Sequence, residues 1–270
     1  MSTLHHSVVR GKDSRPERLC LLVHGILGAG MNLRTVARRL LAAHPSLWFV
    51  LPDLRGHGNS ETGASPHTLG ECARDLARLE SELGQDAMCR IGHSFGGKVV
   101  LERFCQSPAL TVLMDTLPES TPNDDPSREW MRKLIQQLSN VPTPLASRAE
   151  LNQHLGSYGS DAQFCAWMGT NLTSVKSGGF SWRFSLPTIG ELIEDYWDRN
   201  LMGVLGHDSD VHVLFGQNSE RFSADTVARL ANQVGIEKLH EIEGAGHWIH
   251  ADNPEGTIAA LSGILRTLEK

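Results

Sequence analysis

The sequence predicts an α/β fold, in which a mostly parallel sheet is covered by helices on both faces and carries one helical insertion. Short apolar runs of strand length alternate along the chain with segments of helical length and spacing. The alternation stops after residue 117 and returns near residue 201. With 270 residues, 40% of them hydrophobic, the chain can bury one large core, so one domain with an insertion is favoured over two equal domains.

The predicted strands are continuous apolar runs, which are typical of strands buried on both faces of a sheet. They are CLLVHGI (20–26), LWFVLPD (47–53), AMCRIGH (87–93), LTVLMD (110–115), VHVLFGQ (211–217) and KLHEIEG (238–244). The helical segments between them include Leu33, Val36, Ala37, Leu40 and Leu41, then Leu69, Ala73, Leu76 and Leu83, then Val99, Val100, Arg103 and Phe104. Because strand and helix alternate, the sheet is predicted to be mostly parallel.

Residues 118–200 show no convincing strand and three amphipathic stretches, SREWMRKLIQQL, DAQFCAWMGTNL and LPTIGELIEDYWDRNL. We therefore expect a helical cap at 118–200, inserted into a core domain formed by residues 1–117 and 201–270. The stretch SNVPTPLAS (139–147), which contains two prolines, is predicted to be a loop between cap helices.

Aromatic residues are concentrated in this insertion. It holds Trp130, Trp167, Trp182 and Trp197, which are four of the six tryptophans, and both tyrosines, Tyr158 and Tyr196. Aromatic side chains supply rigid apolar walls, so the four tryptophans are candidates for lining a pocket. The alternative is that they build the insertion's own small core.

Charge and composition argue against several classes of protein. A net charge of -6, with histidine neutral, gives no overall basic field for nucleic acid or for an anionic membrane surface. No stretch approaches the roughly 20 apolar residues that span a bilayer, and MSTLHHSVVRGKDSRPERLC lacks the pattern of a signal peptide. Five widely spaced cysteines without a C-x-x-C pair fit reduced structural thiols better than disulfides or zinc. We expect a cytoplasmic protein.

The stretch RIGHSFGGK (90–98) contains G-x-S-x-G in the context that this motif requires. AMCRI before it is typical of a strand and GKVVLERFCQ after it of a helix, so Ser94 would lie on a sharp strand-to-helix turn between small residues. The positive end of the helix dipole would also face Ser94. A serine that merely caps the helix is the alternative. The context favours an exposed nucleophile.

A serine hydroxyl needs a base within hydrogen-bond reach before it can act as a nucleophile. Among 13 histidines His247 is best placed, because EGAGHW follows the last predicted strand and a helix begins near Asn253 and Pro254. His250 is the nearest rival, and is interpreted as a hydrogen-bonding residue near that helix start. The histidines in predicted turns, interpreted as structural, are His24, His57 and His93.

Acyl transfer develops negative charge on a carbonyl oxygen, which two backbone N–H groups can stabilise. HGILGAG follows the strand CLLV, so the turn at His24 and Gly25 would point the Ile26 amide into the site, and the Phe95 amide would be the second donor. A phosphate-binding loop at residues 25–30 is disfavoured, because the sequence has neither the G-x-G-x-x-G order nor the G-K-[ST] ending.

Taken together HGILG, PDLRGHGNS, GHSFGG and GAGHW, in this order and spacing, resemble the α/β-hydrolase superfamily across essentially the whole chain. GGFSWRFSLPTI and GAGHWIHADNPE resemble its small capped serine carboxylesterases, which include the YbfF-type esterases and α/β-hydrolase domain-containing protein eleven. The resemblance implies a serine hydrolase with a helical cap that needs no metal or organic cofactor. It also implies that Asp53 and Arg55 belong to a structural turn beside the site.

The sequence departs from that superfamily at the third member of the catalytic triad. The superfamily usually places an acid in G-x-x-D after the penultimate strand, where this chain has GQNS, ending in Ser219. The candidates are Asp115 at the end of LTVLM, Glu220 beside the vacant position and Asp210 before VHVLF. Catalytic groups collect at the carboxyl ends of parallel strands, which favours Asp115 over Asp210. The similar esterases also imply an acid after this earlier strand, and Ser219 is then expected to hydrogen-bond to His247.

These residues predict a serine carboxylesterase that hydrolyses small to medium apolar carboxylic esters through an acyl-enzyme on Ser94. A serine nucleophile argues against dehalogenase or epoxide hydrolase chemistry, for which the resemblance implies aspartate. The expected partner is a small-molecule ester, with no nucleic acid and no membrane span, and the chain is expected to be a monomer or a small homo-oligomer. The alternatives are a thioesterase or lipid-ester hydrolase with the same triad, and a low-turnover ligand receptor.

Overall fold

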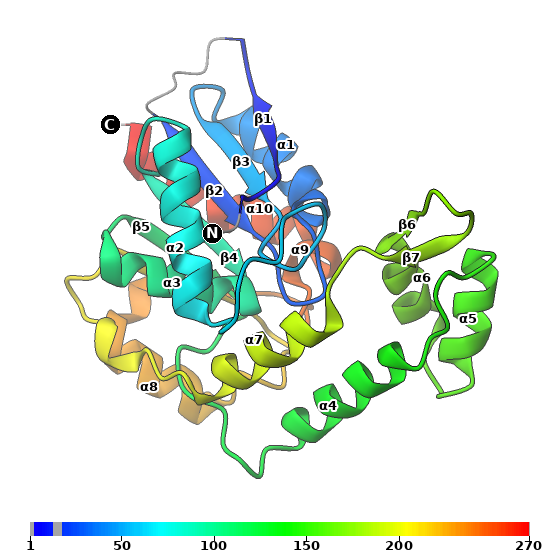
Figure 1. Cartoon of the computed structure of the whole chain (residues 1–270). Helices are drawn as coiled ribbons and strands as arrows, with labels where there is room; N and C mark the ends of the chain where they lie inside the picture. Colours follow the sequence, from blue (N-terminus) through cyan, green and yellow to red (C-terminus); the bar gives the residue numbers. More distant parts are fainter. Residues whose placement is uncertain (1–2, 13–17, 270) are drawn as a thin grey trace.

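The computed structural model describes residues 3–12 and 18–269 and confirms the predicted α/β architecture (Figure 1). In this part of the chain a seven-stranded sheet has the order β1-β3-β2-β4-β5-β8-β9. Its strands are β1 (His6–Arg10), β2 (Leu19–Val23), β3 (Trp48–Pro52), β4 (Cys89–His93), β5 (Leu110–Met114), β8 (Val211–Gly216) and β9 (Leu239–Ile242). The edge strand β1 pairs antiparallel with β3, and the other neighbouring pairs are parallel.

Alternate residues of β2 pack against helices on opposite faces of the sheet. Leu19, Leu21 and Val23 belong to a core cluster shared with α2, α3 and α8. Cys20 and Leu22 belong to a second cluster shared with α1 and α10. All five strand residues are fully buried, so both faces of the sheet are covered, as the continuous apolar runs predict. The core helices are α1 (Arg34–Ala43), α2 (Leu69–Glu82), α3 (Phe95–Gln106), α8 (Ala224–Val234), α9 (Ile249–Asp252) and α10 (Pro254–Leu265).

Short polar side chains define where several helices begin. Thr68 accepts a hydrogen bond from the Glu71 amide at the start of α2. Asn253 accepts one from the Gly256 amide at the start of α10, where Pro254 occupies the first turn. The helix start predicted near Asn253 and Pro254 is confirmed, and α10 begins after the loop that carries His247.

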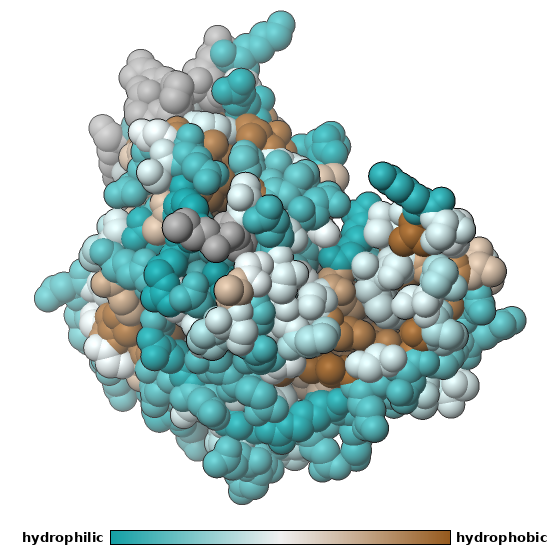
Figure 2. Space-filling model, in the orientation of Figure 1, coloured by the Kyte–Doolittle hydropathy of each residue, from teal (hydrophilic) through white to brown (hydrophobic). Residues whose placement is uncertain are grey.

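The segment inserted between β5 and β8 contains helices and one short hairpin. Its elements are α4 (Pro126–Ser139), α5 (Arg148–Gly156), α6 (Ala162–Thr170), β6 (Leu172–Ser174), β7 (Phe180–Trp182) and α7 (Leu186–Asp198). Figure 1 shows α4 and α7 extending from the core toward α5, α6 and the hairpin. In the same orientation, Figure 2 shows hydrophobic residues in the hollow between α4 and α7. Single 3-10 turns elsewhere are η1 (Gly30–Leu33), η2 (Met202–Val204), η3 (Ile236–Lys238) and η4 (Arg266–Glu269).

Several elements differ from the sequence expectation. The insertion was expected to lack strands, but β6 and β7 pair antiparallel with Leu172 opposite Trp182. Each has three residues, which is too short to give an alternating pattern. The antiparallel edge strand β1 and the helices α5 and α8 were not predicted. In α5, the buried residues Leu151 and Leu155 make a single apolar pair, which is a weak helical signal.

Lys98 in α3 holds both ends of the inserted segment against the core. Its ammonium group is buried and donates hydrogen bonds to the carbonyl oxygens of Glu119 at 2.7 Å, Tyr196 at 2.7 Å and Arg199 at 2.9 Å. The ammonium also lies 4.3 Å from the centroid of the Tyr196 ring, within cation–π range. Burial lowers the pKa of Lys98 to about 7, because the ammonium group loses the solvation that it would have in water.

We expect Lys98→Met to destabilise the protein, because three carbonyl groups would lose their common donor. An unsatisfied buried polar group costs about 1–3 kcal/mol, while removing a poorly solvated ammonium recovers part of the loss, so a net decrease of about 2 kcal/mol in the free energy of unfolding is expected. That corresponds to a fall in Tm of roughly 4 to 8 °C for a chain of this size. Lys133→Met is the control, since Lys133 forms an exposed pair with Glu129. Equal Tm values for the two variants would contradict this account.

Candidate active site

Ser94 lies on a tight turn between the end of β4 and the start of α3, as the G-x-S-x-G motif predicts. Its φ is 52° and its ψ is -117°, a conformation that side-chain-bearing residues rarely adopt. The turn is held by hydrogen bonds from the Ser94 amide to the Met114 carbonyl at 2.9 Å and from Thr116 Oγ1 to the Ser94 carbonyl at 2.9 Å. Neighbouring structure therefore imposes this backbone strain, which projects the serine from the strand edge.

Two glycines of the motif are required by close packing of the backbone. A Cβ at Gly92 would collide with the Gly96 carbonyl oxygen, and one at Gly97 would collide with the Thr116 side chain. Positions 92 and 97 therefore have to lack a side chain for strand, turn and helix to approach this closely.

Asp115 and His247 form a direct pair at the same edge of the sheet. Asp115 follows β5, is fully buried and has a φ of 49°. His247 follows β9, and its Nδ1 lies 2.6 Å from Asp115 Oδ2. Because an ionised carboxylate can only accept, Nδ1 is the protonated nitrogen and Nε2 is left free in the neutral ring. This arrangement gives His247 the tautomer that a general base requires.

Ser219 hydrogen-bonds to Asp115 in place of His247, which corrects the sequence expectation. Its hydroxyl donates to Asp115 Oδ2 at 2.9 Å, and the Gly216 amide donates to Asp115 Oδ1 at 3.1 Å. The expected hydrogen bond from Ser219 to His247 is therefore replaced by one that solvates the buried carboxylate. Glu220 is exposed at the next position, and Asp210 precedes β8, at the opposite edge of the sheet.

Burial and charge set the protonation of His247. Desolvation lowers its pKa below 6.5, the hydrogen bond to Asp115 raises it in part, and the charge of Arg221 lowers it again. The net effect is a lowered pKa, so His247 is neutral at neutral pH and able to accept a proton.

The turns that carry Ile26 and Phe95 lie beside Ser94. The Gly28 amide donates to the Gly25 carbonyl at 3.1 Å, which closes the first turn, and Phe95 is the first residue of α3. Gly30, at the end of the first turn, donates its amide to Asp53 Oδ1 at 2.8 Å. Both Ile26 and Phe95 line the cavity that contains Ser94. Their roles as oxyanion donors stay predictions.

Ser94 and His247 line a cavity of about 990 Å³, whose wall is formed by residues of both the core and the inserted segment. Trp130, Trp167 and Trp197 line it, as do Tyr158 and Tyr196. A volume of this size can enclose a ligand as large as a drug molecule. Trp182 is the exception among the candidate tryptophans, because it does not line the cavity and instead stacks on Phe184 at 4.9 Å between ring centroids.

Cavity-lining residues that the sequence did not single out come from loops and helix faces. Trp248 is 43% exposed, follows His247 directly and lies 6.1 Å from Trp167 between ring centroids. Arg221 lines the cavity from the loop after β8. Its position next to Glu220 was visible in the sequence, but no pattern there indicated which way the side chain would face.

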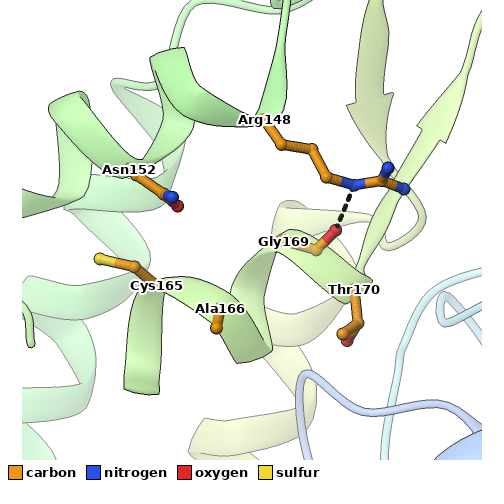
Figure 3. A pocket seen from close by; sticks show the side chains of 6 residues that line it. All are labelled: Arg148, Asn152, Cys165, Ala166, Gly169 and Thr170. Atoms are coloured by element: carbon orange, nitrogen blue, oxygen red, sulfur yellow. Dashed lines mark hydrogen bonds between the residues drawn. The ribbon is translucent and has the colours of Figure 1, made fainter. Parts of the chain in front are cut away.

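A second cavity, of about 400 Å³, lies within the inserted segment (Figure 3). It is lined by Arg148 and Asn152 of α5 and by residues of α6, including Cys165. Figure 3 shows the hydrogen bond from Arg148 to the Gly169 carbonyl, which measures 3.2 Å. Burial raises the pKa of the Cys165 thiol, and none of the predicted catalytic residues lines this cavity.

The histidines beside the site have separate environments. His24 Nε2 accepts from the Leu54 amide at 3.0 Å, and His57 Nε2 accepts from the Leu27 amide at 3.2 Å. Burial lowers the pKa of both, to about 3 for His57. These bonds agree with structural roles in the turns. His250 differs from its expectation, since its buried Nδ1 has no hydrogen-bond partner in the part of the chain that is described.

The turn DLRGHGNS is held by buried polar contacts. Asp53 Oδ2 accepts from the Asn59 amide at 2.9 Å, and the buried Arg55 pairs with Asp75 at 2.7 Å. These contacts agree with a structural role.

Across residues 3–12 and 18–269, no group of three or more His, Cys, Asp and Glu side chains is arranged to hold a metal ion. None of the described helices is both long enough and apolar enough to cross a membrane.

The fold and site have the features of a hydrolase with a nucleophile elbow and a carboxylate–imidazole pair. Residues 20–260 match the model of the alpha/beta hydrolase family, and the chain belongs to that family. It is similar to the sn-1-specific diacylglycerol lipase ABHD11 of Xenopus laevis, with 26% identity over 92% of this chain and 79% of that protein. It is also similar to the esterase YbfF of Escherichia coli (strain K12), with 28% identity over 91% of this chain and 92% of that protein.

A solved structure of a marine microorganism esterase has the same fold. Its TM-score is 0.86, at 22% sequence identity, covering 98% of this chain and all of that chain. The sequence resemblance to the YbfF-type esterases and to α/β-hydrolase domain-containing protein eleven is thereby confirmed. The family and the names of these relatives support a carboxylic ester hydrolase.

The lowered pKa of His247 predicts the acid limb of the pH dependence. A base must be unprotonated, so activity should be present above the pKa of His247 and should fall as the pH drops through it. We expect kcat/KM to be constant near neutral pH and to fall about tenfold per unit below a midpoint that lies under 6.5. Initial rates measured with a neutral ester across the pH range give this midpoint. A midpoint clearly above 6.5 would contradict the assignment of His247 as a largely buried base.

Proposed function

We propose that the chain hydrolyses carboxylic esters through an acyl-enzyme on Ser94, with His247 as general base and Asp115 as the residue that orients it. The observation that carries this proposal is the 2.6 Å contact of Asp115 with His247, whose ring lines the same cavity as Ser94. Ser94 Oγ attacks the ester carbonyl carbon while His247 Nε2 takes its proton. The proton then passes to the leaving alcohol, and an acyl group remains on Ser94.

Deacylation repeats the same steps with water. His247 takes a proton from a water molecule, which attacks the acyl carbonyl, and the proton returns to Ser94 as the carboxylic acid leaves. In each half-reaction the oxygen of the tetrahedral intermediate would accept hydrogen bonds from the amides of Ile26 and Phe95. This role is supported by the location of both residues in the cavity wall and of Phe95 at the N-terminus of α3.

Residues 118–200 act in this proposal as a cap that supplies the apolar part of the substrate site. Trp130 and Trp167 lie on two of its helices and Trp197 on a third, and all three face the cavity that holds Ser94. Such walls favour an apolar acyl or alcohol group of small to medium size over a polar one. The chain would then act on esters whose hydrocarbon portion is enclosed between core and cap.

A lipid ester is the second candidate for the substrate. Two observations favour it: the volume of about 990 Å³, and the name of a relative, which describes that protein as a diacylglycerol lipase. The same nucleophile and base would serve both substrates, so only the chain length and the leaving alcohol distinguish them.

Steady-state hydrolysis of p-nitrophenyl esters from acetate to dodecanoate, with 1,2-dioctanoylglycerol in parallel, tests the nucleophile and the substrate class. We expect Ser94→Ala to lower kcat by roughly 10³-fold or more, because the reaction loses its covalent step. A maximum at short or medium chains would favour the simple ester, and rapid release of fatty acid from the diacylglycerol would favour the lipid ester. Activity retained in Ser94→Ala, with a matching thermal transition, would refute the proposed mechanism.

Single substitutions compare the two candidate acids. Asp115→Asn should lower kcat by roughly 10³- to 10⁴-fold, because an amide neither stabilises the imidazolium nor fixes the required tautomer of His247. Glu220→Gln is the matched control and should stay within about threefold of wild type, since Glu220 is exposed and the described hydrogen bonds of Asp115 involve His247, Ser219 and Gly216 instead. The opposite ranking of the two variants would assign the acid to Glu220.

A further inference from the structure

We propose that His93, the residue before the nucleophile, is a positioning residue that fixes the base loop relative to Ser94 through one hydrogen bond. This inference rests on the proposed function. The bond runs from His93 Nε2 to the backbone carbonyl oxygen of His247, over 2.9 Å. It joins the neighbour of the nucleophile directly to the main chain of the base.

The strands that carry the two residues are not direct neighbours in the sheet. His93 ends β4 and His247 follows β9, and two strands, β5 and β8, lie between them. Backbone pairing therefore connects the two strands only indirectly, through β5 and β8. The same loop has further hydrogen bonds, among them those from the Asn218 amide to the Ala245 carbonyl at 2.8 Å and from the Gly246 amide to Asp252 at 2.9 Å. The side chain of His247 is held separately by Asp115. The His93 bond comes from the residue that directly precedes Ser94, and it holds the main chain of His247.

The acceptor determines the tautomer of His93. A carbonyl oxygen can only accept, so Nε2 of His93 carries the proton. Burial lowers the pKa of His93 well below 6.5, and the neighbouring rings of His247 and His250 and the charge of Arg221 lower it further. The ring is therefore neutral, and Nδ1 is bare. A Cβ built on Gly25 would lie 3.2 Å from this Nδ1, so His93 also packs against the turn that carries Ile26.

Neutrality of His93 matters during the reaction. Its ring centroid is 4.9 Å from that of His247 and 4.8 Å from that of His250. When His247 becomes an imidazolium, a charged neighbour at this distance would oppose it, whereas a neutral ring leaves the Asp115 carboxylate as the dominant partner. His93 can thus hold the base loop without raising the energy of the protonated base.

Two substitutions separate the hydrogen bond from simple packing. His93→Gln places an amide N–H where the imidazole Nε2–H lies, whereas His93→Met fills the space without a donor. We expect His93→Met to lower kcat by roughly 10- to 100-fold with KM within about threefold, because a shift of about 1 Å between base and nucleophile has that cost. We expect His93→Gln to stay within about fivefold of wild type.

His44 provides the matched control outside the site. Its imidazole is also buried, and its Nε2 lies 2.6 Å from Ser262 Oγ. His44→Met should lower the thermal transition as His93→Met does, without a selective fall in kcat. Full activity in folded His93→Met, or an equal loss in folded His93→Gln and His93→Met, would overturn the proposal.

A measurement on the wild-type protein decides the question if the variants fail to fold. Nitrogen-15 NMR at neutral pH should show His93 with a protonated Nε2 and a bare Nδ1, and a reversed tautomer or a charged ring would overturn the proposal. Ser94→Ala keeps the two possible failures apart. Activity in Ser94→Ala would refute the proposed mechanism. An inactive Ser94→Ala together with a fully active His93→Met would refute only the proposed role of His93.

Discussion

The site depends on the hydrogen bonds that converge on the buried carboxylate of Asp115. Its oxygens accept from His247, Ser219 and Gly216, so a group just after β5 binds the last residue of β8 and residues that follow β8 and β9. A buried carboxylate is costly unless its lone pairs are satisfied, and here two neutral donors share that task with the imidazole. The ends of these three strands are thereby joined through one carboxylate, and His247 is held in the tautomer that its proposed role as general base needs.

The nucleophile is placed by a different constraint, the close packing of backbone around Ser94. Gly92 allows β4 to approach α3, and Gly97 allows α3 to approach Thr116. The same packing holds Ser94 at a strained, positive φ. In the proposed mechanism, charge satisfaction orients Asp115 and His247, while steric packing orients Ser94. Hydrogen bonds with Met114 and Thr116 already join the Ser94 turn to the residues on either side of Asp115. The side chain of His93 adds a direct link from this turn to the main chain of His247 over 2.9 Å.

The parts of this architecture that follow from local pattern could be predicted from the sequence. The apolar runs located the buried strands, and the glycines around Ser94 specified the turn, because both signals lie within a few residues. Contacts that depend on tertiary packing could not be predicted. Ser219 was expected beside the base but bonds to Asp115, and Trp182 was a candidate for the cavity but stacks on Phe184. The three-residue strands β6 and β7 escaped prediction because they are shorter than any period that a pattern can reveal.

The cavity has walls from distant parts of the chain, so its shape depends on how the inserted segment is fixed to the core. Lys98 lies one helical turn after Ser94, and its ammonium binds the carbonyl groups of Glu119 and Arg199 near the two ends of that segment. The helix that presents the nucleophile thus also anchors the wall that faces it. Substitutions at Trp130 or Trp167, far from this anchor, should therefore alter which hydrocarbon group fits, while the distances within the Asp115 and His247 pair stay unchanged. The proposed function thus assigns the choice of hydrocarbon group to the inserted segment and the chemistry to the core.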